Sequence, residues 1–525
     1  MINMESDFFK LSKEVANRFI QSVVFIDDRA FQINTDERTN TFDSNVISKV
    51  FAESGKMCAI YAPMTESDIQ AYYPILHKAD VVVLDWYLQL TSESGVDFDP
   101  EADAENDDPR GEYTVKLIHN LIDQGCDKKL KLIVIYTGDN IAAIKDEIVK
   151  EFSLHQFVEE DFSMQINNVR VVLRGKGDNE DKRYHYNKAL NKFVVPYKDL
   201  PDLILSEFTQ MSSGLVSNYA LESATLIRER TSQILGVFSP DLDPAYLGHR
   251  LLLENHSDAK NLLTKLYGEV ITELIESENI NTDNWIDYWL AQNVVERKVN
   301  IGSTELPISK DSLQAIVNSS GNLKDRIQTA TKVSPSGKSI NKYISNLFQY
   351  GVVDVDDSNV KFAQLTHHKN AICPIKLAPN LTLGTIIKSP KDNYVVYYIC
   401  IQQRCDSVRI PNNDEEDRRF VFLQLSTDPK DSNSKSSPII IDKETILYVC
   451  DQSYGIKTIR FKSGDSLSVG AEKQNGRWIF KSIHGEIFEW VVELKELHAQ
   501  RIVNNYCAQL SRIGLNESEW LRLYK

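Results

Sequence analysis

The sequence has no apolar run long enough to cross a membrane. Its longest apolar stretches, such as 394–401, are far shorter than the roughly 20 residues that a transmembrane helix needs. The first ten residues carry Glu5 and Asp7 and lack the basic-then-apolar order of a secretory signal. Seven cysteines are scattered along the chain without the spacing of a disulfide framework. We therefore expect a cytoplasmic protein.

Positive charge is in deficit. The chain carries 59 Lys and Arg residues against 75 Asp and Glu, which gives a formal net charge of −16. A general affinity for nucleic acid or anionic lipid needs charge of the opposite sign, so we expect neither a nucleic acid nor a membrane as a partner. At 525 residues the chain is long enough for about two to four domains, each with its own core.

Complete phosphate-loop and zinc-finger motifs are lacking as well. Gly337-Lys338-Ser339 has the ending of a P-loop, but Lys332 stands where the first glycine of that motif belongs. Several cysteines and histidines of the second half lack the spacing of a recognised zinc finger, namely His367, His368, Cys373, Cys400, Cys405 and Cys450. We expect these side chains to be structural.

Residues 1–214 alternate strand and helix patterns. Apolar runs rich in β-branched residues predict buried parallel strands at 23–26, 57–61, 80–85, 130–136 and 169–173. Amphipathic stretches predict helices at 44–55, 66–78, 111–124, 141–152 and 201–211. This alternation predicts an α/β domain with a doubly wound, five-stranded parallel sheet of the flavodoxin type. An insertion at 97–110 holds seven acidic residues and is expected to be a solvated loop, as is 175–192.

Residues 215–365 form a region of helical pattern. Helices are predicted at 220–238, 246–254, 259–276 and 285–295, and short strands at 351–365. Helices followed by a strand pair within 309–353 would make a winged-helix fold, with Lys338 and Lys342 near its recognition helix. No basic stripe accompanies these two lysines, so packing or dimerisation is the preferred role of this segment.

The last third is predicted to be β-rich. Residues 366–492 are expected to form a small β-barrel-like domain with strands at 394–401, 419–425, 438–441, 446–450, 458–461 and 478–483. Residues 493–525 are expected to be helical, beginning with a helix at 493–510.

Acidic side chains follow two of the predicted parallel strands. Asp27 and Asp28 follow the first strand, and Asp85 follows the third. Because the carboxyl ends of parallel strands meet at one edge of a sheet, these three carboxylates should lie together. They would repel one another unless a cation shared the site. Mg²⁺ is the natural choice because it prefers oxygen ligands.

Two further polar groups stand at strand ends. Thr137-Gly138 follows the fourth predicted strand, and Lys176 follows the fifth. An acid pair, a third acid, a hydroxyl and a lysine in this order, each at a strand end, resemble a response-regulator receiver domain. In that family the third acid takes a phosphoryl group from a histidine kinase.

The resemblance implies a role for each residue of this set. Asp85 would be the phosphoryl acceptor, and Asp27, Asp28 and Asp85 would hold Mg²⁺ together with the carbonyl of Tyr87. Thr137 and the lysine would neutralise oxygens of the transferring phosphoryl group. The protein would then be a phosphoacceptor and not an enzyme with a separate substrate, apart from any intrinsic loss of its own phosphate.

The choice of lysine stays open. Lys176 is not followed by the proline that is usual in receivers, and Lys198 is a rival. The sequence favours Lys176 because 169–173 is the better buried strand. The aromatic switch residue of many receivers would fall near Leu173, which is not aromatic.

The chain as a whole also resembles receiver-domain proteins with long carboxyl-terminal regions. Some of these are similar to receiver proteins of phage-defence two-component systems of the Detocs kind. The resemblance implies a phosphoryl buffer or adaptor whose partners are a histidine kinase, other receiver proteins or a second copy of itself. The alternatives are a degenerate receiver that serves only for docking and, third, a DNA-binding regulator.

Overall fold

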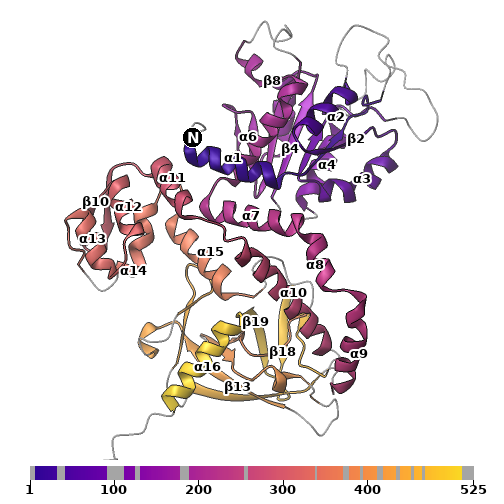
Figure 1. Cartoon of the computed structure of the whole chain (residues 1–525). Coiled ribbons are helices and arrows are strands. Elements are labelled where there is room, and N and C mark those ends of the chain that lie inside the picture. The colour runs from indigo at the N-terminus through magenta and orange to yellow at the C-terminus, as the bar shows by residue number, and fades with distance from the viewer. Residues whose placement is uncertain are drawn as a thin grey trace, which may run out of the picture. The chain divides into compact units, whose positions relative to one another are not determined.

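The structure is a computed structural model, and it divides into two compact units. The first comprises Met1–Glu296 and Ser309–Arg326, and the second Arg297–Ile308 and Ile327–Lys525. Figure 1 traces the chain. The described residues are 6–31, 42–90, 111–123, 130–177, 188–253, 258–336, 340–369, 378–390, 394–408, 410, 418–432, 438–450, 455–463 and 467–510. The predicted acidic insertion at 97–110, Lys338, Cys373 and the last fifteen residues lie outside them.

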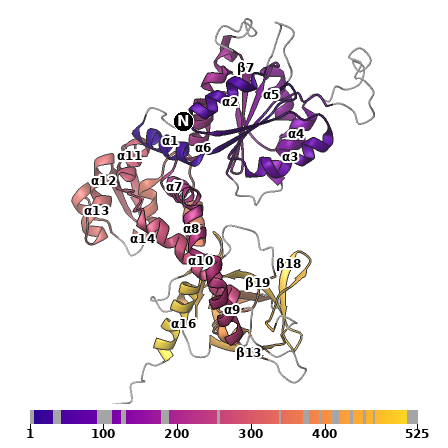
Figure 2. The ribbon, with the colours of Figure 1, turned by 45° about the vertical axis from the view of Figure 1, so that its right-hand side comes forward.

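A parallel sheet forms the centre of the first unit, as the apolar runs predicted (Figure 2). Its five predicted strands are β1 Ser22–Ile26, β2 Met57–Tyr61, β3 Val81–Leu84, β4 Lys131–Thr137 and β7 Val169–Lys176. They are ordered β2-β1-β3-β4-β7, and each is parallel to its neighbours. The side chains of β3 and β4 are buried throughout, which explains why these strands are continuous apolar runs.

Three further strands extend this sheet beyond β7. β5 (Phe157–Val158) and β6 (Ser163–Ile166) add an antiparallel hairpin, and β8 (Val194–Val195) pairs in parallel with the end of β7. The sheet therefore has eight strands rather than five. β6 turns into β7 through Asn167-Asn168, and Asn167 has a φ of 52°. Asparagine tolerates this left-handed conformation, which two-residue hairpin loops require.

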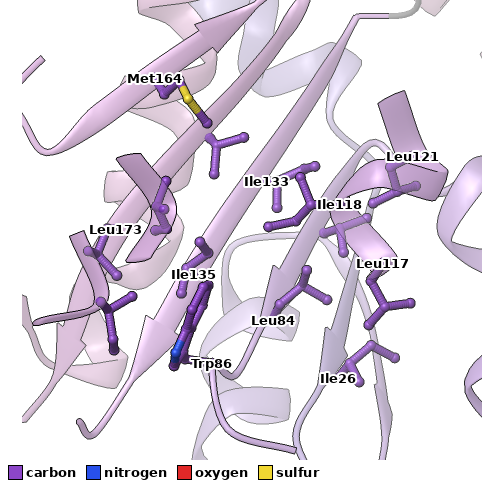
Figure 3. Packing of buried hydrophobic residues seen from close by; sticks show 14 of the residues in the cluster. Ile26, Leu84, Trp86, Leu117, Ile118, Leu121, Ile133, Ile135, Met164 and Leu173 are labelled. Carbon is purple, nitrogen blue, oxygen red and sulfur yellow. The ribbon is translucent and has the colours of Figure 1, made fainter. Parts of the chain in front are cut away.

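Helices cover both faces of the sheet. α3 (Glu66–Lys78), α4 (Glu112–Asp123) and α5 (Ile141–Glu151) contribute to one apolar cluster with β3 and β4. Figure 3 shows the centre of this cluster, where Leu117 and Ile118 of α4 lie near Leu84. Burial of one such side chain stabilises the fold by about 1.5–3 kcal/mol. α2 (Ser44–Glu53) and α6 (Leu200–Ser212) are the remaining predicted helices, and neither contributes to that cluster.

A buried ionic network ties α6 to β7. Nε and Nη2 of Arg170 donate to Oε2 of Glu207 at 3.0 and 2.8 Å, and Nη2 also donates to Asp161 at 2.8 Å. Arg174 lies four residues further along β7 and donates to the other carboxylate oxygen of Glu207. Because an unpaired buried charge costs several kcal/mol, this network fixes the position of β7 and of the residue at its end.

Helices beyond the sheet pack on α1 (Asp7–Phe19), which the sequence patterns did not predict. α6, α7 (Leu215–Glu229) and α11 (Asp283–Asn293) all contact α1. Arg228 of α7 donates from Nη1 and Nη2 to the two carboxylate oxygens of Asp80, both at 3.0 Å. Asp80 also accepts from the backbone N–H groups of Gln21 and Ser22 at 2.9 Å. α7 is therefore clamped to the edge of the sheet where β1 and β3 begin.

The helix predicted at 220–238 is divided between α7 and α8 (Thr231–Val237), and α9 (Asp243–Leu252) and α10 (Asp258–Ser277) form near their predicted places. α12 (Lys310–Asn318) and α13 (Leu323–Thr331) follow, at positions for which no helix bounds were predicted. Among the described residues, no helix combines the length and the apolar character needed to cross a bilayer.

The predicted order of helices and strands around residue 330 was wrong. The strand pair β9 (Arg297–Ile301) and β10 (Thr304–Ile308) precedes the helices, and α14 (Ile340–Tyr343) is followed by a 3-10 helix. Residues 355–365, within the stretch expected to form short strands, instead belong to α15 (Val355–His367). The carboxylate of Asp354 accepts from the N–H groups of Asp356 and Asp357 and so caps this helix. The described residues of 309–353 thus lack the order of a winged helix.

The second unit contains a curled antiparallel sheet of nine strands, with α16 (Glu496–Leu510) on its outside. The strands are β11 Thr385–Pro390, β12 Val395–Cys400, β13 Arg418–Ser426, β14 Ile439–Ile440, β15 Ile446–Val449, β16 Ile456–Phe461, β17 Glu472–Gln474, β18 Arg477–Lys481 and β19 Ile487–Glu493. β11, β17 and β19 were not predicted. Side chains from β11, β12, β13, β16, β18 and β19 share one buried cluster. The N–H of Ile483 donates to the carbonyl of Arg460 at 3.0 Å, so the sheet bends back on itself as a barrel-like domain does.

Candidate functional site

Three carboxylates meet at the carboxyl edge of the parallel sheet. Ile26 and Leu84 are partners in the register of β1 and β3, so the residues that follow them, Asp27 and Asp85, lie side by side. The N–H of Asp85 donates to the carbonyl of Ile26 at 2.8 Å and continues the ladder. One carboxylate oxygen from each of Asp27, Asp28 and Asp85 lies within 4.8 Å of the others. Their residues are only 2%, 6% and 9% exposed.

One lysine enters this acidic cluster from β7. Nζ of Lys176 lies 2.5 Å from Oδ2 of Asp27 and 3.1 Å from Oδ2 of Asp85. The ammonium also lies over the rings of Phe42 and Tyr136, at 5.4 and 6.0 Å from their centroids. The rival Lys198 is exposed on a short 3-10 helix (Tyr197–Asp199). The structure therefore places Lys176, and not Lys198, among the acids.

Burial and mutual repulsion shift the pKa values of two of the acids. Burial, followed by the charge of Asp27, raises the pKa of Asp28 to about 6. Burial also raises the pKa of Asp85 to about 7, with the charges of Asp27 and Asp28 acting in the same direction and Lys176 opposing them. Burial alone would lower the pKa of Lys176, but Asp85 and Asp27 outweigh it and raise that pKa. One lysine does not neutralise three carboxylates, so the cluster still favours a cation.

The predicted hydroxyl is in place at the end of the neighbouring strand. Thr137 is the last residue of β4 and is fully buried. It is the register partner of Gly175, which precedes the site lysine. Oγ1 of Thr137 accepts from the N–H of Asp139 at 3.1 Å, so the hydroxyl is held by its own loop. The structure thus brings an acid pair, a third acid, a hydroxyl and a lysine to one edge of the sheet.

The loop after Asp85 is held by residues that the sequence reasoning missed. Oγ1 of Thr114 donates to the carbonyl of Asp85 at 2.7 Å, and the N–H of Trp86 donates to Oδ1 of Asp85 at 2.9 Å. Gly111 has a φ of +84°, and a Cβ there would lie 2.3 Å from the Trp86 ring. Tyr87 follows in this loop and is half-buried, and its carbonyl remains a predicted metal ligand.

The donor set suits a hard divalent cation. Each of the three acids offers a carboxylate oxygen, and such oxygens are the ligands that Mg²⁺ prefers. Within the described parts of the chain, no other group of three or more His, Cys, Asp or Glu side chains lies close enough to share an ion.

Comparison with known families agrees with this geometry. Residues 19–181 match the family model described as "Response receiver domain". The matched segment contains all three acids, Thr137 and Lys176, and it ends before Lys198. A comparison with curated proteins found no match for the chain. Residues 19–181 of this chain are therefore a response receiver domain.

Proposed function

We propose that this chain is a signalling protein that accepts a phosphoryl group on Asp85 from a histidine kinase. The observation that carries the proposal is the contact of Lys176 with both Asp27 and Asp85 inside a buried cluster of three carboxylates. A structural ion pair needs only one acid, whereas phosphoryl transfer needs a carboxylate nucleophile with positive charge on either side.

The chemistry follows from this arrangement. A carboxylate oxygen of Asp85 attacks phosphorus as the bond between phosphorus and the kinase histidine breaks, and the histidine nitrogen keeps the electron pair. Mg²⁺ held by Asp27, Asp28 and Asp85 would supply positive charge to the phosphoryl oxygens. Lys176 lies 3.1 Å from Asp85 and can move onto a second oxygen once phosphate is attached. Thr137 would donate its hydroxyl to a third.

A cation also has a second use at this site. With a pKa of about 7, Asp85 is only partly ionised at neutral pH, and a protonated carboxyl is a poor nucleophile. Positive charge beside the carboxylate lowers its pKa and so increases the reactive fraction. The proposal therefore makes phosphoryl acceptance dependent on a divalent cation.

We further propose that the protein acts as a phosphoryl buffer or adaptor. β3 (Val81–Leu84) lies between Asp80 and Asp85, and Arg228 holds α7 at the Asp80 end, away from the acceptor. An output helix that is fixed there would respond weakly to phosphate at the opposite edge. The phage-defence setting and the partnership with other receiver proteins rest on resemblance alone, and a neighbouring kinase gene would support them.

Intact-mass measurement tests the proposal. The full chain, incubated with acetyl phosphate and Mg²⁺, should gain one phosphoryl group, and Asp85→Asn should gain none. Asp146→Asn, an exposed carboxylate change on α5, is the matched control and should behave as the wild type. An adduct that survives Asp85→Asn would refute the proposal. So would the absence of any adduct with acetyl phosphate, phosphoramidate and the kinase; a degenerate receiver used for docking would then be the better account.

A further inference from the structure

Two neighbouring helices of the first unit expose several leucines. α9 and α10 contact each other and lie side by side in Figures 1 and 2. No side chain of α9 is buried. The exposed leucines of these two helices, called the leucine surface below, are Leu247, Leu251 and Leu252 on α9 and Leu263 and Leu266 on α10.

The leucine surface needs a cover. Leu251 and Leu252 are 78% and 87% exposed, and Leu247 lies one helical turn before Leu251 on the same face of α9. Isolated helices shorter than about 12 residues are marginal in water, and α9 has ten. A large exposed apolar surface on a folded protein marks an interface with another molecule.

The charges of α10 are separated along its length. After Asp258 at its first position, the exposed charged side chains of this helix are Lys260 and Lys265 in the first half and Glu269, Glu273 and Glu276 in the second. None of these five exposed side chains forms an ion pair with a described residue.

This order of charge is unfavourable for α10 by itself. A helix has a partial positive charge at its amino end and a partial negative charge at its carboxyl end. Lys260 lies in the first turn and Glu276 in the last turn, so each is beside the end that carries its own sign. Glu269 and Glu273 are four residues apart, and like charges at this spacing repel each other. A neighbouring helix with the reverse order of charge would compensate for both effects.

A second copy of α10 supplies that reverse order. A two-fold axis that crosses α10 makes the two copies antiparallel, so that the basic half of each lies beside the acidic half of the other. In a parallel pair, lysines would meet lysines and glutamates would meet glutamates. The charges therefore favour another copy of this chain, in one orientation, as the cover of the leucine surface.

We propose that the leucine surface is the interface of a symmetric dimer in which the two α10 helices run antiparallel. Burial of the leucines would supply the affinity, and the charges of α10 would set the orientation. Two helix pairs that meet in this way can bury their apolar sides as four-helix bundles do. This interface goes beyond the proposed function and is independent of it, so the dimer should also form in EDTA and in Asp85→Asn.

Sedimentation equilibrium of the full chain in EDTA tests the proposal. We expect a mass twice that of one chain. Leu251→Glu should weaken the dimer at least about tenfold, because it places a charge in the interface. Leu154→Glu is the matched control and should leave the dimer unchanged, since Leu154 is 94% exposed in the same unit but outside α9 and α10. Circular dichroism of both variants should equal that of the wild type, because neither leucine is buried.

Two charge variants test the antiparallel arrangement. Lys260→Glu with Lys265→Glu makes the second to fifth of these charges and the first all acidic, and Glu269→Lys with Glu273→Lys and Glu276→Lys makes all five basic. Each variant alone should dimerise at least about tenfold more weakly than the wild type, and the two mixed should form a heterodimer.

Three results would overturn the proposal. The first is a wild-type chain that is monomeric at every concentration tested, including one in which slow hydrogen exchange of α9 shows that another part of the same chain covers it. The second is a Leu251→Glu variant that dimerises as tightly as the wild type. The third is a pair of charge variants that each self-associate as tightly as the wild type.

Discussion

Replacing Asp28 by asparagine should stabilise the receiver domain when no divalent cation is present. The pKa of Asp28 is about 6 in the folded chain against an ordinary value of 3.8. For an acid with a raised pKa, the folded state holds the proton more tightly than the unfolded state. Its destabilising effect therefore grows as the pH rises from 3.8 to 6 and is complete above that.

The size of the effect follows from the same numbers. A difference of about two pH units corresponds to roughly 3 kcal/mol at pH 8, which is an upper limit because the asparagine forfeits hydrogen bonds made by the carboxylate. We expect Asp28→Asn to raise the free energy of unfolding by about 1–3 kcal/mol in EDTA. Mg²⁺ should stabilise the wild type and have little effect on the variant, since one ligand is gone.

Unfolding curves of the full chain at pH 8, in EDTA and in Mg²⁺, measure both effects. Asp146→Asn, whose carboxylate is exposed on α5, controls for loss of a negative charge as such and should change neither curve. A variant that is no more stable than the wild type in EDTA would show that burial and the charge of Asp27 do not destabilise the Asp28 carboxylate. A variant that keeps the wild-type response to Mg²⁺ would show that Asp28 is not a ligand.

Three further outcomes are expected. In EDTA, the rate at which acetyl phosphate modifies the chain should rise with pH through about 7, because only ionised Asp85 attacks. Mg²⁺ should make this rate less dependent on pH. A rate that does not change with pH in EDTA would contradict the assigned pKa. Lys176→Met should lower the free energy of unfolding, measured with urea in EDTA, by about 3–5 kcal/mol, because two buried acids lose their cation. Lys198→Met should lower it by almost nothing. Equal losses for the two variants would be inconsistent with the site. Arg228→Met should speed hydrogen exchange in α7, whereas Arg230→Met, at an exposed arginine, should not. Beryllium fluoride should leave exchange in α7 of the wild type unchanged, as expected of a buffer. Slower exchange there on addition of beryllium fluoride would indicate a switch.

The strands of the receiver domain were predictable because a strand buried on both faces is a continuous apolar run in the sequence. β3 and β4 are apolar at nearly every position, and polar residues follow them at once. Since parallel strands share an edge, the meeting of Asp27 and Asp85 followed from the order of the strands alone. The contact of Lys176 with both acids needed the structure, because its strand runs on past the apolar run through pairing with β8.

The missed elements have different reasons. β17 is short and exposed, but Asn475-Gly476, which joins it to the predicted strand β18, has positive φ at both residues and was a readable hairpin signal. α15 was mistaken for strands because its Asp354 cap was overlooked. The network of Arg170 and Glu207 could not be predicted, because these residues are 37 positions apart and no local pattern relates them.

The central claim is that Asp85 itself carries the phosphoryl group. Borohydride reduces an aspartyl phosphate to homoserine, and peptide mass spectrometry then locates the converted residue. After treatment of the full chain with acetyl phosphate and Mg²⁺, conversion should occur at Asp85, and it should be much slower in EDTA. Conversion at Asp27 or Asp28 in place of Asp85, or none at any of the three, would contradict the account.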